Sequence, residues 1–184
     1  MKQCLVLIDI QNDYFKGGKY ELVNPEQAAM QAIKVLTRFR EWGWPVVHVC
    51  HLSIQPRAAF FIPDTEGSEI YREIRPLETE DVIIKHRPDS FLDTTLKAKL
   101  EEKGINQLVV CGMMTHMCID TTVRAAVGHG YDVTLIEDAC ATRDLEWHGN
   151  IISAEQVQNV YLASLAGMFA RVVKADTWIS ENNM

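Results

Sequence analysis

Short hydrophobic runs alternate along the chain with longer segments in which hydrophobic residues recur every three or four positions. The short runs predict buried strands, and the longer segments predict amphipathic helices packed against them. The expected strands are 3–10, 45–51, 81–85, 106–111, 132–136 and 170–174. The expected helices are 24–42, 92–103, 118–129 and 153–167, and the proline-containing stretch 54–79 is expected to form a loop with one short helix.

Local signals support several of these boundaries. Asn24 followed by Pro25, with Gln27 three residues after the Asn, is typical of a helix start. Ser153 and Gln156 have the spacing of a capping box, which predicts the start of the last helix. Gly43 follows the first helix and is expected to end it.

Strands that alternate with helices indicate a parallel sheet covered by helices on both faces. We therefore expect one doubly wound α/β domain over residues 1–184, because no linker, repeat or low-complexity segment interrupts the pattern. In such sheets, ligands bind outside the carboxyl ends of the strands. Candidate chemistry is therefore sought at those strand ends.

Composition narrows the class of protein. The 184 residues are 47% hydrophobic and carry a formal net charge of −7, which argues against nucleic acid or an anionic membrane as a partner. The first apolar run is too short for a signal peptide and reaches an aspartate at once. Four of the five cysteines (4, 50, 111 and 140) lie in or beside strand-like runs. We expect them to be reduced core residues of a cytoplasmic protein.

Three reactive side chains stand at the expected strand ends. Asp9 ends the first strand, Lys85 ends the third, and Cys118 follows the fourth strand at the start of a helix. The helix dipole and the free N–H groups there favour a thiolate and can bind an oxyanion. Each residue also has a structural interpretation: a turn aspartate, a solvated lysine and a buried cysteine. The coincidence of all three at one edge favours a catalytic site.

The chemistry of these groups suits acyl transfer. The Cys118 thiolate would attack a carbonyl carbon and become acylated. The Lys85 ammonium would lower the pKa of the thiol, and Asp9 would accept its proton and pass it to a leaving amine. Backbone N–H groups near Met114 and Cys118 would stabilise the tetrahedral oxyanion.

The segments around these residues resemble the isochorismatase-like cysteine hydrolases over nearly the whole chain. The resemblance rests on Val6–Phe15, on Lys85 followed by Ser90-Phe91, and on the Gly-x-x-Thr-x-x-Cys pattern of 112–118. It implies a three-layer αβα fold with a six-stranded, mostly parallel sheet. It also implies an Asp9–Lys85–Cys118 triad, a cis peptide bond between Met113 and Met114 at the oxyanion hole, and a homo-oligomer, either a dimer or a tetramer.

Within that family, a cysteine at the nucleophile position favours the hydrolases of C–N bonds over the isochorismatases proper, which cleave a vinyl ether. Nicotinamidases resemble one another in an Asp-x-His metal motif, and this chain has none. His48 and His51 stand on one strand at a spacing that puts them on opposite faces, a poor start for a metal site. We therefore expect no metal and no cofactor.

Residues near the expected edge are candidates for binding a small-molecule substrate. Phe15, Phe91 and Trp147 are candidates for an apolar pocket wall, with ordinary packing as the open alternative. Gln11 is a candidate for orienting Asp9, with a turn role as its alternative, and His86 is a candidate for polar contact with the substrate.

Charged residues in the loops are harder to interpret. Arg57 and Arg87 have the chemistry to bind a substrate carboxylate, although solvation is the default state of a surface arginine. Asp138, Arg143 and Asp144 follow the fifth strand, and the sequence does not separate site from surface for them.

The sequence thus predicts a cysteine-dependent hydrolase that cleaves a C–N bond of a small amide or N-carbamoyl compound through a Cys118 acyl-enzyme. The alternatives are an isochorismatase-type ether hydrolase and a small-molecule-binding protein on the same fold, either non-catalytic or redox-active. The intact triad argues against a non-catalytic role, and the lack of a Cys-x-x-Cys pair weakens the redox role.

Overall fold

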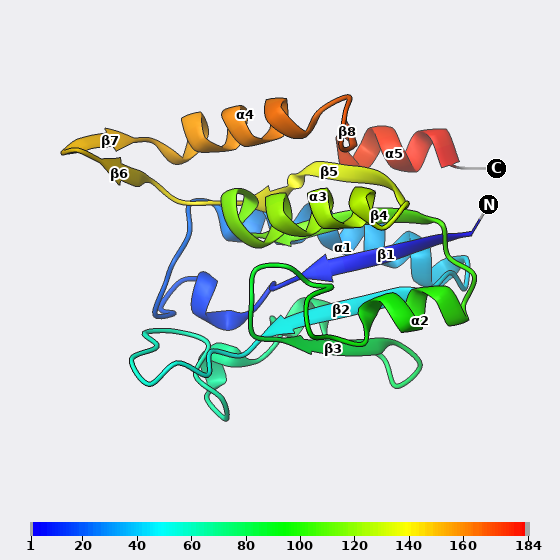
Figure 1. Ribbon diagram of the computed structural model, residues 1–184, viewed down its shortest axis with the longest axis horizontal. Coiled ribbons are helices and arrows are strands. Elements are labelled where there is room, and N and C mark those ends of the chain that lie inside the picture. Colours follow the sequence, from blue (N-terminus) through cyan, green and yellow to red (C-terminus); the bar gives the residue numbers. More distant parts are fainter. Residues whose placement is uncertain (1, 183–184) are drawn as a thin grey trace.

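A single parallel sheet forms the centre of the molecule in the computed structural model, which describes residues 2–182 (Figure 1). The strand order is β3-β2-β1-β4-β5-β8. The strands are β1 (Gln3–Ile8), β2 (Val46–His51), β3 (Asp81–Lys85), β4 (Gln107–Met113), β5 (Asp132–Ala141) and β8 (Arg171–Val173). The order reverses at β1 and β4, as expected for a doubly wound fold, so their carboxyl ends flank the crevice in which such folds bind ligands.

Helices cover both faces of this sheet. One hydrophobic cluster joins Leu5 and Leu7 of β1 to α1 (Pro25–Glu41) and α5 (Ala175–Asn182). The alternate β1 residues, including Val6, belong to a second cluster with residues of α2 (Leu96–Glu102), α3 (Asp120–Gly128) and α4 (Ala154–Leu165). Because successive side chains of a strand point to opposite faces, a continuous hydrophobic strand supplies both layers. The three-layer αβα expectation is confirmed.

Several boundaries differ from those that the sequence predicts. The capping box at Ser153 is present, whereas Asn24 has a left-handed backbone (φ 54°) and its side chain caps nothing. The second helix begins at Leu96 and not at 92, because the Thr94 hydroxyl bonds Ser90 O at 2.6 Å and closes a turn there. The loop 54–79 holds two short 3-10 helices, Glu66–Ser68 and Arg72–Ile74, where one helix was expected.

The region after β5 holds the largest difference from expectation. β5 continues to Ala141, and a register shift in its pairing between Val110 and Gly112 of β4 accommodates the extra length. A two-stranded hairpin then follows, made of β6 (Leu145–Trp147) and β7 (Asn150–Ile152). It projects from the body of the molecule (Figure 1), and none of its strand residues is buried. Helix α5 was likewise not predicted.

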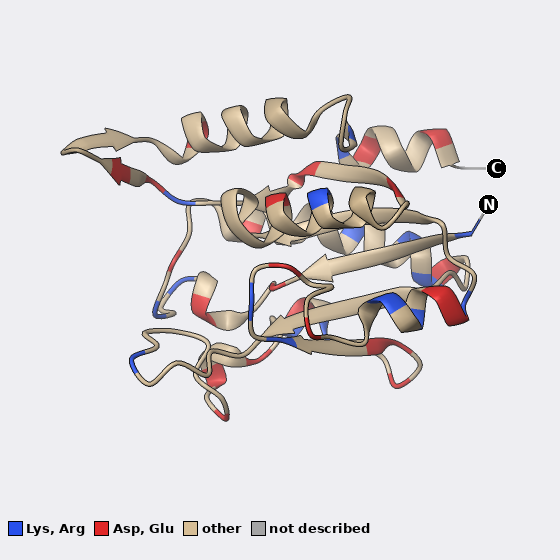
Figure 2. Ribbon diagram, in the orientation of Figure 1, with Lys and Arg blue, Asp and Glu red and all other residues tan. Residues whose placement is uncertain are grey.

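Charged residues of both signs are interspersed along the chain in the view of Figure 2. None of the helices that the structure describes combines the length and hydrophobicity needed to cross a bilayer. Among the described residues, the charged side chains with no exposed area are Asp9 and Lys85, and both lie at the carboxyl edge of the sheet.

Candidate active site

Strands β1 and β3 and the turn after β4 bring Asp9, Lys85 and Cys118 together. The Lys85 Nζ atom lies 2.7 Å from Asp9 Oδ2 and 3.1 Å from Cys118 Sγ. Asp9 and Lys85 are 0% exposed, and Cys118 is 5% exposed. β2 separates β3 from β1 in the sheet, so the long lysine side chain reaches across one strand to meet the carboxylate.

The turn that carries Cys118 has a closely fitted backbone. The expected cis peptide bond joins Met113 to Met114, and a π-helical turn, Thr115–Ile119, leads directly into α3. Gly112 precedes it with φ 133°, and a Cβ added there would lie 2.0 Å from Ile8 O of β1. Only glycine therefore lets β4 pass so close to β1 at the level of Asp9.

Side chains hold the same turn against β5 and α4. Thr115 Oγ1 lies 2.6 Å from Gln158 Oε1 and 3.2 Å from Ala141 O. Gln158 in turn donates from Nε2 to two carbonyl oxygens of β5. His116 Nδ1 lies 2.6 Å from the Thr142 hydroxyl oxygen. These contacts take His116 away from Cys118, in agreement with the expectation that the two residues do not face each other.

Burial and the neighbouring charges set the protonation of the triad. Burial raises the pKa of the Cys118 thiol well above its ordinary range, Asp9 raises it further, and Lys85 lowers it. Lys85 acts in the predicted direction, whereas burial and Asp9 act against it and favour the neutral thiol. Burial also disfavours the Lys85 ammonium, but the pairing with Asp9 and Cys118 outweighs it and raises the lysine pKa.

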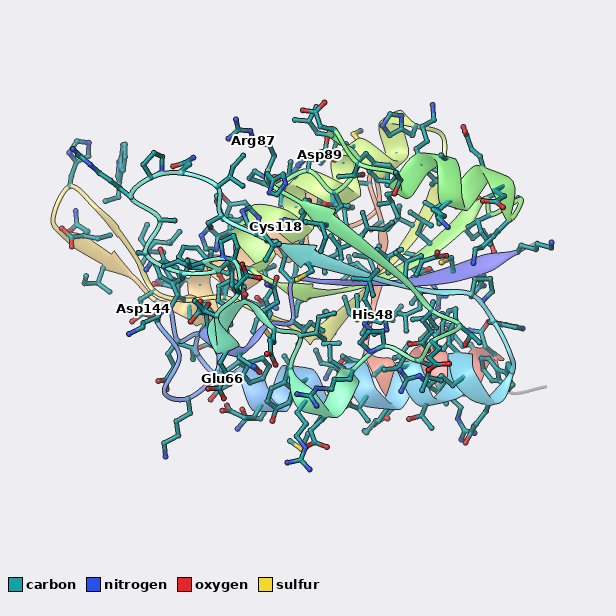
Figure 3. All side chains as sticks on the ribbon, turned by 90° about the horizontal axis from the view of Figure 1, so that it is seen from below. His48, Glu66, Arg87, Asp89, Cys118 and Asp144 are labelled. Atoms are coloured by element: carbon teal, nitrogen blue, oxygen red, sulfur yellow. The ribbon has the colours of Figure 1, made fainter. Side chains whose placement is uncertain are left out.

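His51 is a fourth member of the cluster, which the sequence analysis did not place at the site. It pairs in register with Lys85, and its Nδ1 lies 3.1 Å from Lys85 Nζ. Burial and the lysine charge lower the pKa of His51 to about 4, so the ring is neutral at pH 7 and accepts a hydrogen bond from the ammonium. His48 instead bonds Glu80 at 2.9 Å, on the face of the sheet that α1 covers (Figure 3).

The donor atoms of Asp9, His51 and Cys118 lie within 4.8 Å of one another, a spacing that would suit a metal ion. Lys85 Nζ, however, contacts all three of these side chains, at 2.7 to 3.1 Å. The cation that these three groups share is therefore the lysine ammonium.

Gln11 has a role different from the one predicted. Its Nε2 donates to His51 O at 2.9 Å and to Ser68 O at 2.7 Å, and its Oε1 accepts from His51 N at 2.8 Å. The side-chain amide is thereby used to join the end of β2 to the loop at Ser68, and it supports His51 rather than orienting Asp9.

The other predicted substrate-binding residues are dispersed. Phe15 stacks on Tyr71 with ring centroids 3.8 Å apart, and both line a cavity of about 590 Å³ between 12–19 and 60–75. His86 is exposed, and its Nδ1 lies 2.7 Å from Leu52 O.

Phe91 and Trp147 lie in surroundings that the sequence did not predict. Phe91 packs in the core against His129 and Tyr131, at the far end of α3 from Cys118, so its contacts are those of a packing residue. Trp147 is 68% exposed on the projecting hairpin, and its ring contacts His148. The hairpin was not expected, and its strand β6, which ends at Trp147, projects outward from the sheet (Figure 1).

The sequence analysis did not identify Tyr14 as a site residue, and it left Arg143 open between site and surface. Tyr14 is 1% exposed. Burial raises the pKa of its hydroxyl group most, and the charges of Cys118 and Asp9 raise it further. Arg143 packs over the Tyr20 ring, with Cζ 4.6 Å from the centroid. Tyr14 lies within the Val6–Phe15 segment, which could have drawn attention to it, whereas no pattern separates Arg143 from other loop arginines. Arg57 and Arg87, the predicted carboxylate-binding residues, are exposed.

Comparison with known proteins shows to which family this chain is similar. Residues 3–175 match the model of the isochorismatase domain. The chain is 51% identical over 179 residues to the isochorismatase family protein YddQ of Bacillus subtilis, covering 97% of this chain and 99% of that protein. It is 33% identical to nicotinamidase 3 of Arabidopsis thaliana, covering 94% and 85%. The crystal structure of an isochorismatase hydrolase from Oleispira antarctica superposes with a TM-score of 0.94 at 44% identity, covering 97% and 96%.

Proposed function

Because the chain belongs to the isochorismatase family of hydrolases, we propose that it hydrolyses a C–N bond of a small amide or N-carbamoyl compound through an acyl-enzyme on Cys118. One observation carries this proposal: a buried lysine ammonium holds a carboxylate at 2.7 Å and a cysteine sulfur at 3.1 Å. A nucleophile, a base and a fixed positive charge are the groups that covalent amide hydrolysis needs. The similarity to a nicotinamidase, an enzyme named for an amide, supports the same choice.

The nucleophile is a neutral thiol until substrate binds, because burial and Asp9 both raise its pKa. Asp9 is the base that removes the thiol proton as the sulfur attacks the carbonyl carbon. Lys85 remains protonated throughout, since its pKa is raised by the two groups that it contacts. Its charge stabilises first the Asp9 carboxylate and then the sulfur as negative charge develops there.

Attack forms the S–C bond and moves the carbonyl electron pair to oxygen. The backbone N–H groups of Met114 and Cys118 would receive this oxyanion at the start of the π-helical turn. Collapse of the intermediate breaks the C–N bond, and Asp9 returns the proton to nitrogen, so the amine or ammonia leaves neutral.

Water completes the cycle. Asp9, again a carboxylate, takes a proton from a water molecule that attacks the thioester carbon. Breaking the S–C bond releases the acid, and the proton returns to the Cys118 sulfur. The triad is thereby restored, and the net reaction consumes one water molecule for each C–N bond cleaved.

The test is ammonia release from a panel of small amides and N-carbamoyl compounds. Cys118→Ala is expected to abolish turnover of any substrate that the natural protein cleaves. Cys4→Ala is the matched control, because Cys4 is also a buried thiol but lies at the amino-terminal end of β1. Turnover that persists in Cys118→Ala, or that is lost equally in Cys4→Ala, would contradict the proposal.

A further inference from the structure

Strand β3 ends the sheet on one side, and its outer edge is apolar. β3 follows β2 at the end of the strand order and forms the lower boundary of the sheet in the view of Figure 1. Val82 and Ile84 are 44% and 43% exposed, although both lie within this strand. An exposed strand edge with apolar side chains is a site at which another strand can pair.

The backbone of β3 directs hydrogen-bonding groups toward this outer edge. Lys85 O accepts from Leu52 N at 3.0 Å, so the polar backbone groups of Lys85 point toward the chain of β2. Because successive residues of a strand direct their N–H and C=O groups to opposite sides, those of Val82 and Ile84 point away from the sheet. The two residues with exposed side chains are therefore also residues with outward backbone groups.

The features that usually protect a sheet edge from pairing are missing from β3. Such features are very short strands, exposed charges and prolines. β3 contains no proline, its cation Lys85 is 0% exposed, and its anion Asp81 pairs with Lys99 and Lys103. At the opposite edge of the sheet, β8 has three residues, and its exposed side chain is that of Arg171. The two edges therefore differ, and the edge at β3 is the one suited to pairing.

Charges at the two ends of β3 favour one orientation of a second β3 strand. Glu78 precedes the strand and Arg87 follows it, both are exposed, and neither forms an ion pair with a residue between 2 and 182. In an antiparallel pair of two such strands, each Glu78 lies near Arg87 of the other copy, whereas a parallel pair would bring like charges together. An antiparallel pair of identical strands has two-fold symmetry and closes into a dimer.

We propose that β3 pairs antiparallel with β3 of a second copy of this chain, so that the two sheets continue into one. With Ile83 at the two-fold axis, Val82 lies opposite the second copy's Ile84, and their outward N–H and C=O groups bond to each other. Val82 and Ile84 of both copies then lie on one face of the joined sheet and cover one another. The pairing bonds β3, the strand that carries Lys85, on both of its sides.

Particle mass in solution, measured by analytical ultracentrifugation, tests this interface. Ile84→Lys places a charge on the outer edge and is expected to halve the mass of the natural protein, with circular dichroism showing that the variant is folded. Ile151→Lys is the matched control, because it changes an isoleucine that is 66% exposed on the separate strand β7. A natural protein that stays a single chain at micromolar concentration would overturn the proposal and leave the edge to a strand of another protein. An undiminished mass in Ile84→Lys, or a loss confined to Ile151→Lys, would also overturn it.

A disulfide bond tests the antiparallel register and does not depend on a charged variant. Val82→Cys and Ile84→Cys, co-expressed and oxidised, are expected to form a disulfide between copies, because opposite residues of the pair have Cα atoms about 5.5 Å apart. Each variant alone is expected to stay unlinked, since like positions lie diagonally at about 7–8 Å. Peptide mass spectrometry identifies the linked peptides. No link in the mixture, or an equal link in each variant alone, would overturn the proposed pairing.

Discussion

Lys85 Nζ lies 2.7 Å from a carboxylate oxygen of Asp9, and neither side chain is exposed to solvent. An ion pair removed from water is retained only where its partners satisfy each other, and here the ammonium also contacts Cys118 and His51. Burial and the neighbouring Asp9 both raise the pKa of the Cys118 thiol, which favours a neutral sulfur beside this pair. The reactivity of Cys118 is governed by the Asp9 carboxylate as well as by Lys85.

Removing the Asp9 charge should make Cys118 more reactive as a thiol and less competent as a catalyst. Asp9 raises the pKa of Cys118, so Asp9→Asn lowers it and lets the Lys85 ammonium pair with a thiolate. We expect faster alkylation of Cys118 by iodoacetamide at pH 7 together with a loss of turnover, because the base is gone.

The pH dependence of that alkylation shows whether the Asp9 charge raises or lowers the pKa of Cys118. In the natural protein the rate should still be rising above pH 9, since burial holds the thiol pKa above its ordinary range. In Asp9→Asn the rise should move to lower pH, and Asp9→Glu, which keeps the charge, should not show this shift. A rise at the same pH or at a higher pH in Asp9→Asn would contradict the claim that the Asp9 charge raises the thiol pKa.

Removing the lysine charge from the Asp9–Lys85 ion pair should lower the free energy of unfolding. Lys85→Met leaves Asp9 buried without a counterion, and we expect it to lower the free energy of unfolding by about 3 kcal/mol. The double variant Asp9→Asn/Lys85→Met replaces both charges and should recover much of that loss. Urea denaturation of both single variants and the double variant measures the coupling, and simple additivity of the two single losses would contradict a buried ion pair.

A second buried carboxylate predicts how stability depends on pH. Glu80, whose side chain is 6% exposed, pairs with Arg40 at 2.7 Å and with His48 at 2.9 Å. Burial would raise its pKa, but hydrogen bonds from Arg40, Leu77 N–H and His48 outweigh burial and lower it from 4.5 to about 2. A carboxyl group with a depressed pKa stabilises the folded state above its ordinary pKa, and this contribution is lost between about pH 5 and pH 2.

Glu80→Gln should therefore lower the free energy of unfolding by about 2 kcal/mol at pH 7, and the difference from the natural protein should shrink as the pH falls below 5. Urea titrations at a series of pH values would measure it. Glu78→Gln is a nearby control, since no ion pair of the described residues includes Glu78. A difference that stays constant down to pH 3 would show that the Glu80 network does not contribute through its charge.

Chelators should leave activity unchanged, because the Lys85 ammonium lies among the three side chains that could otherwise bind a metal ion, Asp9, His51 and Cys118. Incubation with EDTA or 1,10-phenanthroline, followed by an assay of ammonia release, provides the check. A loss of activity that zinc restores would require Lys85 to leave that position.

The sequence predicted the parts of the site that follow from strand periodicity. Asp9 and Lys85 end hydrophobic runs, and Cys118 follows another such run after a glycine, so the carboxyl edge of a parallel sheet collects all three. The role of His51 depends on its register with Lys85, and that register cannot be predicted from the sequence of either strand alone. The interpretation of the region after β5 failed because a short hairpin with exposed hydrophobic residues has no burial pattern. Without that region, neither Trp147 nor Arg143 could be placed.

The central claim, an acyl group carried by Cys118, is tested most directly by intact-mass and peptide mass spectrometry. The protein would be quenched in acid during turnover of a panel compound that releases ammonia. The account predicts a mass increase equal to the acyl group, located on the Cys118 peptide and absent from Cys118→Ala, which releases no ammonia. Ammonia release that continues in Cys118→Ala, with no adduct on the Cys118 peptide of the natural protein, would contradict covalent catalysis.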